Sequence, residues 1–385
     1  MRHALLLLTL LLALLLSACD GDTPQSTTTL RVDQAMGGQP DPGFARALEP
    51  RAFKFPQDHG AHPEFATEWW YLTGNLMSET GQHFGYQLTL FRVGLRPGEA
   101  QQDSSWRTHQ VYMGHLAISD IAAARHYSAE RFARAAAGLA GARSDPFEVW
   151  LGPWSIHTDN ERSTLAVTAQ QNDIGVSLQL QPGNKPLVLQ GERGLSRKSA
   201  TPGNASYYYS LTRLPTRGKL RIGDKLYTVE GNSWMDREWS SSALDKDQAG
   251  WDWFALQLDD GRDLMLYRLR GPDGHTSFAL GTLVDQDGNG RTLPPEAWSL
   301  KPLEHWSSPG TEAEYPVRWQ LIVPGEGIDL VLDAILPQQE NQSRRSGVHY
   351  WEGAMTAHPA GRPEETVGRG FVELTGYGEG SRPPV

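Results

Sequence analysis

The sequence predicts an all-β protein built from antiparallel sheets of the barrel or sandwich type. Apolar residues recur at every second position in residues 84–90, with Gln87 and Thr89 pointing to the opposite face of the strand. The same alternation returns in residues 251–258, and signals for helices are few. These observations together favour consecutive strands joined by short turns, as in an antiparallel meander.

The meander is clearest in the second half of the chain. Its first strand is predicted at residues 251–258, and the turn Asp-Asp-Gly-Arg at 259–262 leads into a second strand at 264–269. A third strand at 276–284 ends at the Asp- and Gly-rich segment 285–290.

One helix is expected. Phe132, Ala136 and Leu139 fall near helical spacing in residues 129–142. We expect a short helix there, as an appendage to the sheet.

Length and composition bound the organisation of the chain. Its 385 residues suggest two domains or one large domain, and we place two β-rich domains at residues 51–239 and 240–378. The polar segment 240–249 marks the boundary. Thirteen Trp and twelve Tyr would supply large buried areas. A formal net charge of −10 argues against general nucleic-acid binding, so no nucleic-acid partner is expected.

Residues 1–18 are expected to be a signal peptide. Their apolar run at residues 4–16 is shorter than the about 20 residues that cross a membrane and fits a secretory signal. The run ends in Leu-Ser-Ala-Cys, which looks like a bacterial lipobox, so Cys19, the only cysteine, is expected to be lipidated. Residues 19–50 are polar or rich in Gly and Pro and are expected to form a flexible tether, with an arm packed on the body as the alternative.

The residue after Cys19 bears on the location of the protein. In enteric bacteria, Asp directly after the lipidated cysteine tends to retain lipoproteins at the inner membrane, and Asp20 occupies this position. We therefore expect a periplasmic protein held at the inner membrane by its lipid anchor.

The densest polar stretch is Asp-His-Gly-Ala-His-Pro-Glu at residues 58–64. His59 and His62, with the neighbouring carboxylates, could ligate Zn²⁺ or Fe²⁺. The alternative is a turn in which these side chains form a structural or ligand-facing polar network. The second interpretation is favoured because Gly60 and Pro63 oppose a metal-binding helix, so no metal or other cofactor is predicted.

Glu68 precedes the three aromatic residues Trp69, Trp70 and Tyr71. If Glu68 points into a barrel, burial would raise its pKa and keep it protonated, as a general acid requires. If it points outward, it is a solvated carboxylate. The three aromatic residues are candidate ligand contacts.

A second dense stretch places Asp236 and Glu238 on either side of Arg237, with Trp234 and Trp239 bracketing all three. An Asp in aromatic surroundings can remain neutral and donate a proton to an alkene, and aromatic faces would stabilise the resulting cation. The structural alternative is an Asp–Arg–Glu ion-pair network at the domain junction. Asp236, Glu238 and Glu68 are therefore the candidate catalytic residues.

Six segments carry a family resemblance. They are FPQDHGAHPEFATEWWYLTGNL at 55–76, MGHLAISD at 113–120, GLSRKS at 194–199, YYYSLTRLPTRG at 207–218, GNSWMDREWSSSAL at 231–244 and GWDWFALQLDDGRDLMLYRL at 250–269. Over residues 53–377 the chain resembles the hydroxyneurosporene synthase family, whose members are also called carotenoid 1,2-hydratase-like or AttH-like proteins. The resemblance implies two tandem lipocalin-like antiparallel β-barrel domains.

The resemblance also implies a range of functions. Hydratases of the family add water to a terminal C=C of an acyclic carotenoid after protonation by an Asp, and Asp236 best matches that role. Other bacterial members are exported, lie beside ABC transporter components and have no assigned activity.

Three functions are therefore considered. The first is a lipid-anchored periplasmic protein that binds an apolar, lipid- or isoprenoid-like ligand and works with ABC transporter components. The second is a hydratase that protonates an isoprenoid C=C through Asp236, and the third is a metal-dependent secreted hydrolase using His59 and His62. The lipid anchor favours the first over the hydratase. The residues expected to contact the ligand are Trp69, Trp70, Tyr71, Trp234, Arg237, Trp239, His59 and His62.

Overall fold

The computed structural model describes residues 42–98, 104–159, 164–242, 244–343 and 347–378. Across these ranges the chain forms two antiparallel sheets and three 3-10 helices, with no α-helix. Nor do they include any helix long and apolar enough to cross a membrane. The expected signal peptide, Cys19 and Asp20 lie outside the described residues.

The first sheet, sheet A, has 13 strands. They are β1 (Thr67–Ser78), β2 (His83–Gly94), β3 (Gln110–Asp120), β4 (Arg125–Arg134), β5 (Ala140–Ser144), β6 (Phe147–Leu151), β7 (Trp154–Asp159), β8 (Thr164–Gln171), β9 (Ile174–Leu180), β10 (Val188–Leu189), β11 (Leu195–Arg197), β12 (Ala205–Ile222) and β13 (Lys225–Ser240).

The second sheet, sheet B, has 10 strands. They are β14 (Gly250–Leu258), β15 (Asp263–Arg270), β16 (Thr276–Val284), β17 (Gly290–Leu293), β18 (Ser299–Ser307), β19 (Glu314–Val323), β20 (Ile328–Ala334), β21 (Glu340–Gln342), β22 (His349–Pro359) and β23 (Gly368–Leu374). The 3-10 helices are η1 (Gln57–His59), η2 (Pro295–Ala297) and η3 (Pro324–Glu326).

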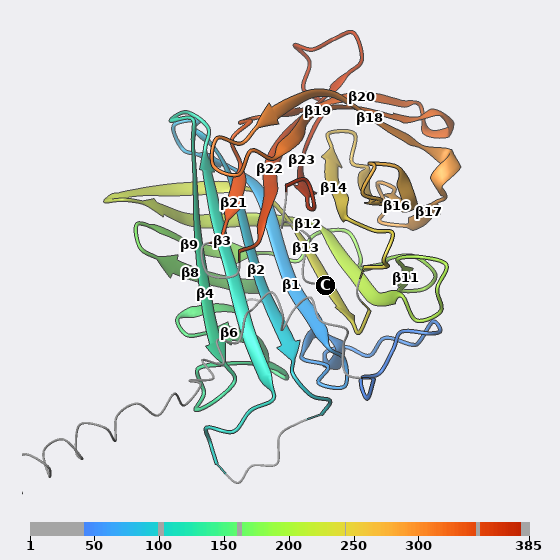
Figure 1. Ribbon diagram of the computed structural model, residues 1–385. Coiled ribbons are helices and arrows are strands. Elements are labelled where there is room, and N and C mark those ends of the chain that lie inside the picture. The colour runs from blue at the N-terminus through green and yellow to red at the C-terminus, as the bar shows by residue number, and fades with distance from the viewer. Residues whose placement is uncertain (1–41, 99–103, 160–163, 243, 344–346, 379–385) are drawn as a thin grey trace, which may run out of the picture. The chain divides into compact units, whose positions relative to one another are not determined.

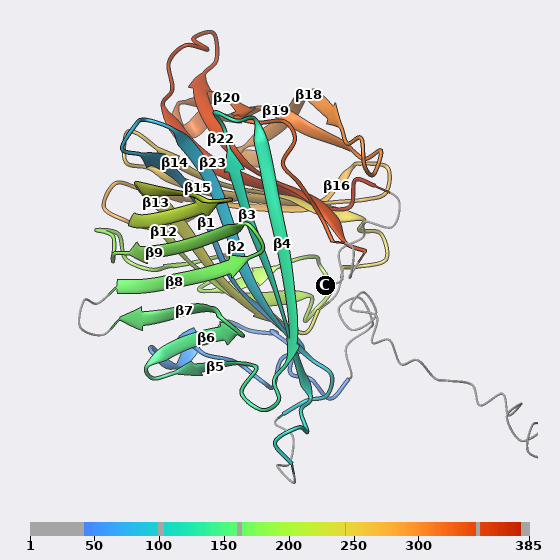
Figure 2. The same ribbon diagram turned by 90° about the vertical axis from the view of Figure 1, so that its left-hand side faces the viewer.

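Both sheets are mainly meanders, and each brings its last long strands back beside its first. Sheet A runs in the order β4-β3-β2-β1-β13-β12-β9-β8-β7-β6-β5, and sheet B in the order β17-β16-β15-β14-β23-β22-β20-β19-β18. Figure 1 shows β1–β4 side by side, and Figure 2 shows β5–β9 running across them, so that sheet A curls over its own core. A Cβ on Gly114 of β3 would lie 2.9 Å from the ring of Trp154 of β7, so this close approach requires a glycine.

These observations confirm the predicted all-β, barrel-type fold. The strands predicted at 251–258, 264–269 and 276–284 are β14, β15 and β16. The helix predicted at 129–142 is wrong, because these residues lie in β4 and β5 and the turn between them. Most of β4 is half exposed, so its apolar side chains give no clear strand alternation.

Side-chain alternation divides the apolar residues among three layers. Trp70 and Leu72 of β1 point into the core of sheet A, together with Leu88 of β2. The intervening residue Tyr71 points the other way and packs with Trp253 of sheet B in a separate cluster. A third cluster, formed within sheet B, includes Phe254 and the other residues that point away from sheet A.

Residues 42–50 pack on the body. Phe44 and Ala47 are buried, and the Ala45 N–H donates a 2.9 Å hydrogen bond to the carbonyl of Glu64. The Tyr207 hydroxyl donates a 2.9 Å hydrogen bond to the Glu49 carbonyl. The predicted flexible tether therefore does not extend over these residues, and its remainder lies outside the described residues.

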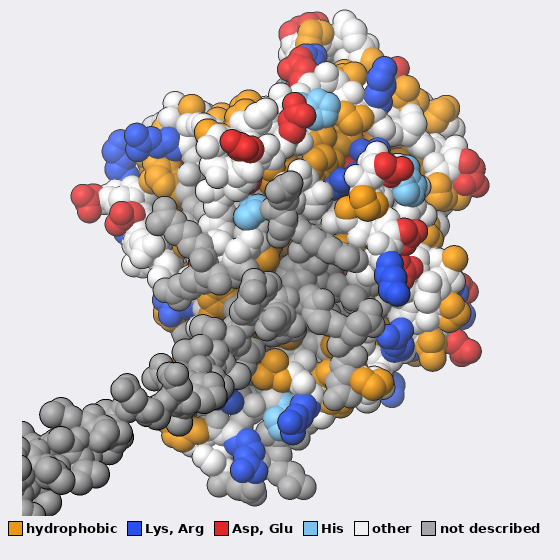
Figure 3. Space-filling model, in the orientation of Figure 1, with side chains coloured by type: hydrophobic (Ala, Val, Ile, Leu, Met, Phe, Trp, Pro, Cys, Tyr) orange, Lys and Arg blue, Asp and Glu red, His pale blue; other side chains and the backbone are white. Residues whose placement is uncertain are grey.

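On the face seen in Figure 3, acidic and basic side chains are interspersed.

Candidate active site

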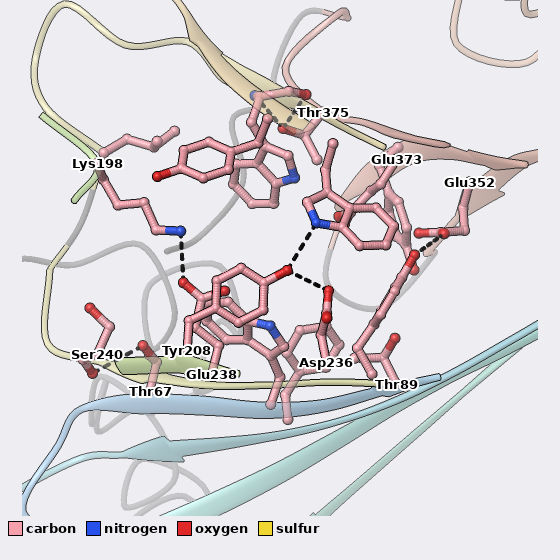
Figure 4. A pocket seen from close by; sticks show the side chains of 18 of the residues that line it. Thr67, Thr89, Lys198, Tyr208, Asp236, Glu238, Ser240, Glu352, Glu373 and Thr375 are labelled. Atoms are coloured by element: carbon pink, nitrogen blue, oxygen red, sulfur yellow. Dashed lines mark hydrogen bonds and ion pairs between the residues drawn. The ribbon is translucent and has the colours of Figure 1, made fainter. Parts of the chain in front are cut away.

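A cavity of about 150 Å³ lies between sheet A and sheet B (Figure 4). Its walls are largely apolar, with many aromatic side chains and several acidic side chains among them. Sheet A contributes residues of β1, β2, β3, β12 and β13, and sheet B contributes residues of β14, β15, β22 and β23. The site therefore lies between the sheets and not inside either barrel.

The cavity-facing residues of sheet A form a row across five neighbouring strands. Strand register places Ser210 opposite Asp236, Asp236 opposite Tyr71, Tyr71 opposite Thr89 and Thr89 opposite His115. Since side chains directly opposite each other share one face of a sheet, the row points toward sheet B as a unit.

Asp236 is the best-positioned acid in this row. Its Oδ1 accepts hydrogen bonds from the Ser210 hydroxyl at 2.5 Å and the Trp234 indole at 2.7 Å. Its Oδ2 accepts a 2.6 Å bond from the Tyr208 hydroxyl. Burial raises the pKa of Asp236 to about 7, even though all three hydrogen bonds favour the ionised form. Near neutral pH the carboxyl is therefore protonated in a large share of molecules.

Glu238 forms an ion pair with Lys198. The Lys198 Nζ lies 2.8 Å from its Oε1, and the Ser206 hydroxyl donates to the same oxygen. Burial opposes the charge of Lys198, but Glu238 nevertheless raises the pKa of this lysine. The Lys198 Nζ also lies 4.5 Å from the centre of the Tyr267 ring. The pair therefore forms a charged site beside the apolar cavity (Figure 4).

Two further carboxyls face the cavity from sheet B. Burial raises the pKa of Glu373 to about 8. Burial and the neighbouring Glu373 raise the pKa of Glu352 well above its ordinary value. The Tyr71 hydroxyl donates a 2.5 Å hydrogen bond to Glu352 Oε1, which joins β1 of sheet A to β22 of sheet B. Burial therefore favours the protonated form of both carboxyls.

Glu68 and Arg237 point away from this cavity, into the core of sheet A. Both are fully buried, and Glu68 forms ion pairs with Arg237 and with Arg92. Burial alone would raise the pKa of Glu68, but the two guanidinium groups hold it well below its usual range. Glu68 is thus ionised, which contradicts the general-acid interpretation. The expected Asp–Arg–Glu network is also wrong, because Arg237 pairs with Glu68 and lies 4.0 Å from the centre of the Trp70 ring.

The histidine-rich segment joins the same buried network. His62 Nε2 lies 3.1 Å from Asp58 Oδ1 and its Nδ1 lies 3.2 Å from Glu68 Oε2, while its ring stacks on Trp239 at 3.9 Å. His59 Nδ1 lies 2.6 Å from the Tyr209 hydroxyl. These contacts fit a structural polar network. The described residues include no group of three or more His, Cys, Asp or Glu arranged to hold a metal ion.

Comparison with known proteins identifies the family. The model of the AttH-like family matches residues 46–377. The chain belongs to the AttH-like family. It is 36% identical to a protein from Nitrosomonas europaea assigned to AttH, whose crystal structure superposes with a TM-score of 0.76 over 87% of this chain and 100% of that one. No curated protein sequence matches the chain.

Two further solved structures share the fold of this AttH-like protein at low identity. Kievitone hydratase from Nectria haematococca is 14% identical, with a TM-score of 0.61 over 87% of this chain and 97% of its own. CghA, in complex with Sch210972, is 16% identical, with a TM-score of 0.52 over 90% and 97% of the two chains.

The AttH-like fold separates the predicted site residues into two groups. Trp69, Tyr71, Asp236 and Glu238 line the cavity, and Trp234 contacts Asp236 beside it. The other predicted residues lie outside the cavity lining and belong to the network in sheet A. They are Glu68, Trp70, Arg237, Trp239, His59 and His62.

Sequence reasoning missed several residues that line the cavity. They are His115, Lys198, Tyr208, Tyr350, Glu352 and Glu373. A usable signal existed for Glu352, because it falls in phase with Tyr350 and Ala354 on one face of β22. An acidic residue at an otherwise apolar strand position indicates a partner or a function.

The site can donate protons in apolar surroundings. Asp236 is protonated in a large share of molecules near neutral pH, and Trp69 and Trp253 line the cavity. Glu238 and Lys198 supply a charged pair at its wall. This combination suits acid–base chemistry on an uncharged ligand.

Proposed function

We propose that this protein hydrates a C=C bond of a small uncharged ligand, or catalyses the reverse dehydration, with Asp236 as the proton donor. The observation that carries the proposal is a buried carboxyl with a pKa of about 7 that faces an aromatic cavity. The fold shared with kievitone hydratase supports the reaction class. The fully paired state of Glu68 supports Asp236 over Glu68 as the acid.

The geometry supports a defined path for the proton. Oδ1 of Asp236 is occupied by Ser210 and Trp234, so Oδ2 is the oxygen that carries the proton. Oδ2 contacts the Tyr208 hydroxyl, which also accepts a 3.1 Å hydrogen bond from the Trp253 indole. When Asp236 is protonated it donates to Tyr208, whose own O–H can then turn toward the ligand.

The proposed reaction balances without a cofactor. The proton adds to the less substituted carbon of the C=C, and the π electrons form the new C–H bond. A water oxygen then bonds to the resulting cation, and the proton released from that water returns to the Asp236 carboxylate. The rings of Trp69 and Trp253 stabilise the cation through their faces.

The size of the cavity limits the ligand. A cavity of about 150 Å³ is comparable to one that holds a benzene molecule. It accommodates a single ring or the end of a chain, and an entire carotenoid would extend beyond it. We therefore propose a ligand, or a reacting end, of about the size of one substituted ring.

The proposal is tested with α-methylstyrene in ¹⁸O-labelled water. Wild-type protein should form 2-phenylpropan-2-ol that carries ¹⁸O, measured by gas chromatography and mass spectrometry. Asp236→Asn should lower the rate about 100-fold or more, the contribution typical of a general acid. Asp329→Asn alters an exposed Asp and is the matched control. Unlabelled or absent product, or full activity of Asp236→Asn, would contradict the proposal.

A carrier function is the second candidate, and the largely apolar lining of the cavity favours it. A carrier would release its apolar ligand unchanged, so mass spectrometry of the recovered ligand separates the two functions. Conversion during incubation supports the enzyme, and recovery of unchanged ligand with measurable affinity supports the carrier.

We also propose that the protein is lipidated at Cys19 and held at the periplasmic face of the inner membrane, beside ABC transporter components. The support comes from the lipobox-like sequence and from Asp20. At that location the site would handle apolar molecules drawn from, or returned to, the membrane.

A further inference from the structure

Beyond Tyr71, at the end of the cavity opposite Asp236, three buried polar atoms lack hydrogen-bond partners. Gln87 Oε1, His115 Nε2 and Glu352 Oε2 have none among the described residues. All three side chains line the cavity and are at least nine-tenths buried. Because unpaired buried polar atoms are unfavourable, their convergence on one cavity points to a ligand group that completes them.

The proton on His115 can be assigned from its neighbour. Burial lowers the pKa of His115 to about 4, so the ring is neutral at pH 7 and carries one proton. The Tyr350 hydroxyl lies 2.8 Å from Nδ1, and burial holds the pKa of Tyr350 well above its ordinary value. The phenol therefore keeps its proton, and we assign it as the hydrogen-bond donor to Nδ1. The ring proton lies on Nε2, which is the unpaired donor.

Glu352 supplies a second donor and Gln87 an acceptor. Burial favours the protonated form of Glu352, and because Oε1 accepts the Tyr71 hydroxyl, the carboxyl proton is assigned to the unpaired Oε2. The Gln87 amide nitrogen donates to Thr89 at 2.5 Å and lies 3.5 Å from the Tyr350 hydroxyl. Its Oε1 is left as an acceptor.

Two donors and one acceptor complement a hydroxyl group, which accepts two hydrogen bonds and donates one. We propose that Gln87, His115 and Glu352 form a subsite that binds an alcohol or phenol hydroxyl of the ligand. Among the described lining residues, Lys198 is the single Lys or Arg, and it pairs with Glu238. An uncharged hydroxyl is thus favoured over a carboxylate. The inference rests on the proposed function, since it assigns a ligand group to the same cavity.

The strand register sets where this hydroxyl lies relative to the reacting carbon. Asp236 and His115 are three strands apart in one row, with Tyr71 and Thr89 between them. Neighbouring strands are about 4.8 Å apart, so the two backbones lie about 14 Å apart. The ligand is therefore expected to carry its hydroxyl at the end opposite the C=C.

Calorimetric binding of phenol and benzene at pH 6 tests the subsite. Wild-type protein should bind phenol about tenfold more tightly than benzene, the effect of one or two neutral hydrogen bonds. His115→Phe and Glu352→Met should each bring the ratio close to one while benzene affinity is kept. Benzene binding also reports that each variant is folded. Thr282→Val is the matched control, because it removes a buried unpaired hydroxyl outside the cavity lining.

The outcomes separate the two proposals. Equal binding of both probes by wild-type protein, or an unchanged tenfold preference in His115→Phe and Glu352→Met, overturns the subsite alone. A failure of the hydration assay with the phenol preference intact overturns the proposed reaction and leaves the subsite supported. If neither probe binds, the subsite is overturned, and the hydration assay alone decides the proposed reaction.

Discussion

The hydroxyl of Tyr208 donates a 2.6 Å hydrogen bond to Oδ2 of Asp236. The same hydroxyl accepts a 3.1 Å bond from the Trp253 indole, so it joins the acid of sheet A to an aromatic wall of sheet B. Asp236 thus has its proton-carrying oxygen in contact with a phenol that reaches the cavity.

Removal of this hydroxyl should change both rate and pH dependence. Tyr208→Phe deletes a hydrogen bond that favours ionised Asp236, so the pKa of Asp236 should rise above about 7. The fall in activity at high pH should move to higher pH, and the rate should drop about tenfold or more because the path for the proton is broken. The pH profile of product formation measures both effects. Tyr227→Phe, with a partly exposed phenol on β13, is the control, and an unchanged profile in Tyr208→Phe would refute the relay.

Glu68 should matter for stability and not for proton donation. Glu68→Gln leaves Arg92 and Arg237 buried without their shared counter-charge, which should lower the free energy of unfolding by about 3–5 kcal/mol. Denaturation in urea at pH 7 measures this loss. Glu304→Gln breaks an exposed ion pair with Arg318 and should change the free energy of unfolding by less than about 1 kcal/mol. A loss in Glu68→Gln no larger than in this control would contradict the network.

The buried acids of the cavity predict a pH dependence of stability. The pKa of Asp236 is raised to about 7 and that of Glu373 to about 8, so their contribution to stability is present below about pH 4 and is lost as pH rises through these values. The free energy of unfolding of Asp236→Asn should therefore rise relative to that of wild type by about 1.4 kcal/mol per pH unit between pH 5 and 7.

Buried histidines such as His115 have the opposite effect: the free energy of unfolding falls as pH drops below 6.5, because burial lowers the pKa of His115 to about 4. Their effect cancels when wild type and Asp236→Asn are compared at each pH. Urea denaturation from pH 5 to pH 8 provides the comparison, and a difference that does not vary with pH would rule out the raised pKa of Asp236.

The proposed anchor predicts where the protein is found in cells. Cys19→Ala should release it from the membrane fraction, because the lipid attaches to this thiol. Asp20→Ser should move it from the inner to the outer membrane. Sucrose-gradient fractionation with immunoblotting measures both changes, and an outer-membrane location of the wild type would contradict the proposal.

Local patterns in the sequence predict the strands well and the cavity only in part. The alternation in residues 250–269 suffices for β14 and β15, because a strand repeats every two residues regardless of its partners. The helix prediction at 129–142 failed because β4 is half exposed and lacks this alternation.

Asp236 and Trp69 could be identified from the sequence because each lies in a dense aromatic or acidic motif. Glu373 could not, since it comes from β23 and reaches the site only when sheet B packs on sheet A. Glu68 was misjudged for a related reason. Its two arginine partners lie on other strands, and their charges decide its protonation state.

The central claim is that Asp236 holds a proton near neutral pH. Infrared difference spectroscopy of wild type against Asp236→Asn measures this directly, through the C=O band of a protonated carboxyl. We expect a band that is present at pH 5, is absent from the variant and disappears with a midpoint near pH 7. A midpoint near pH 4, the ordinary value for Asp, would contradict the account.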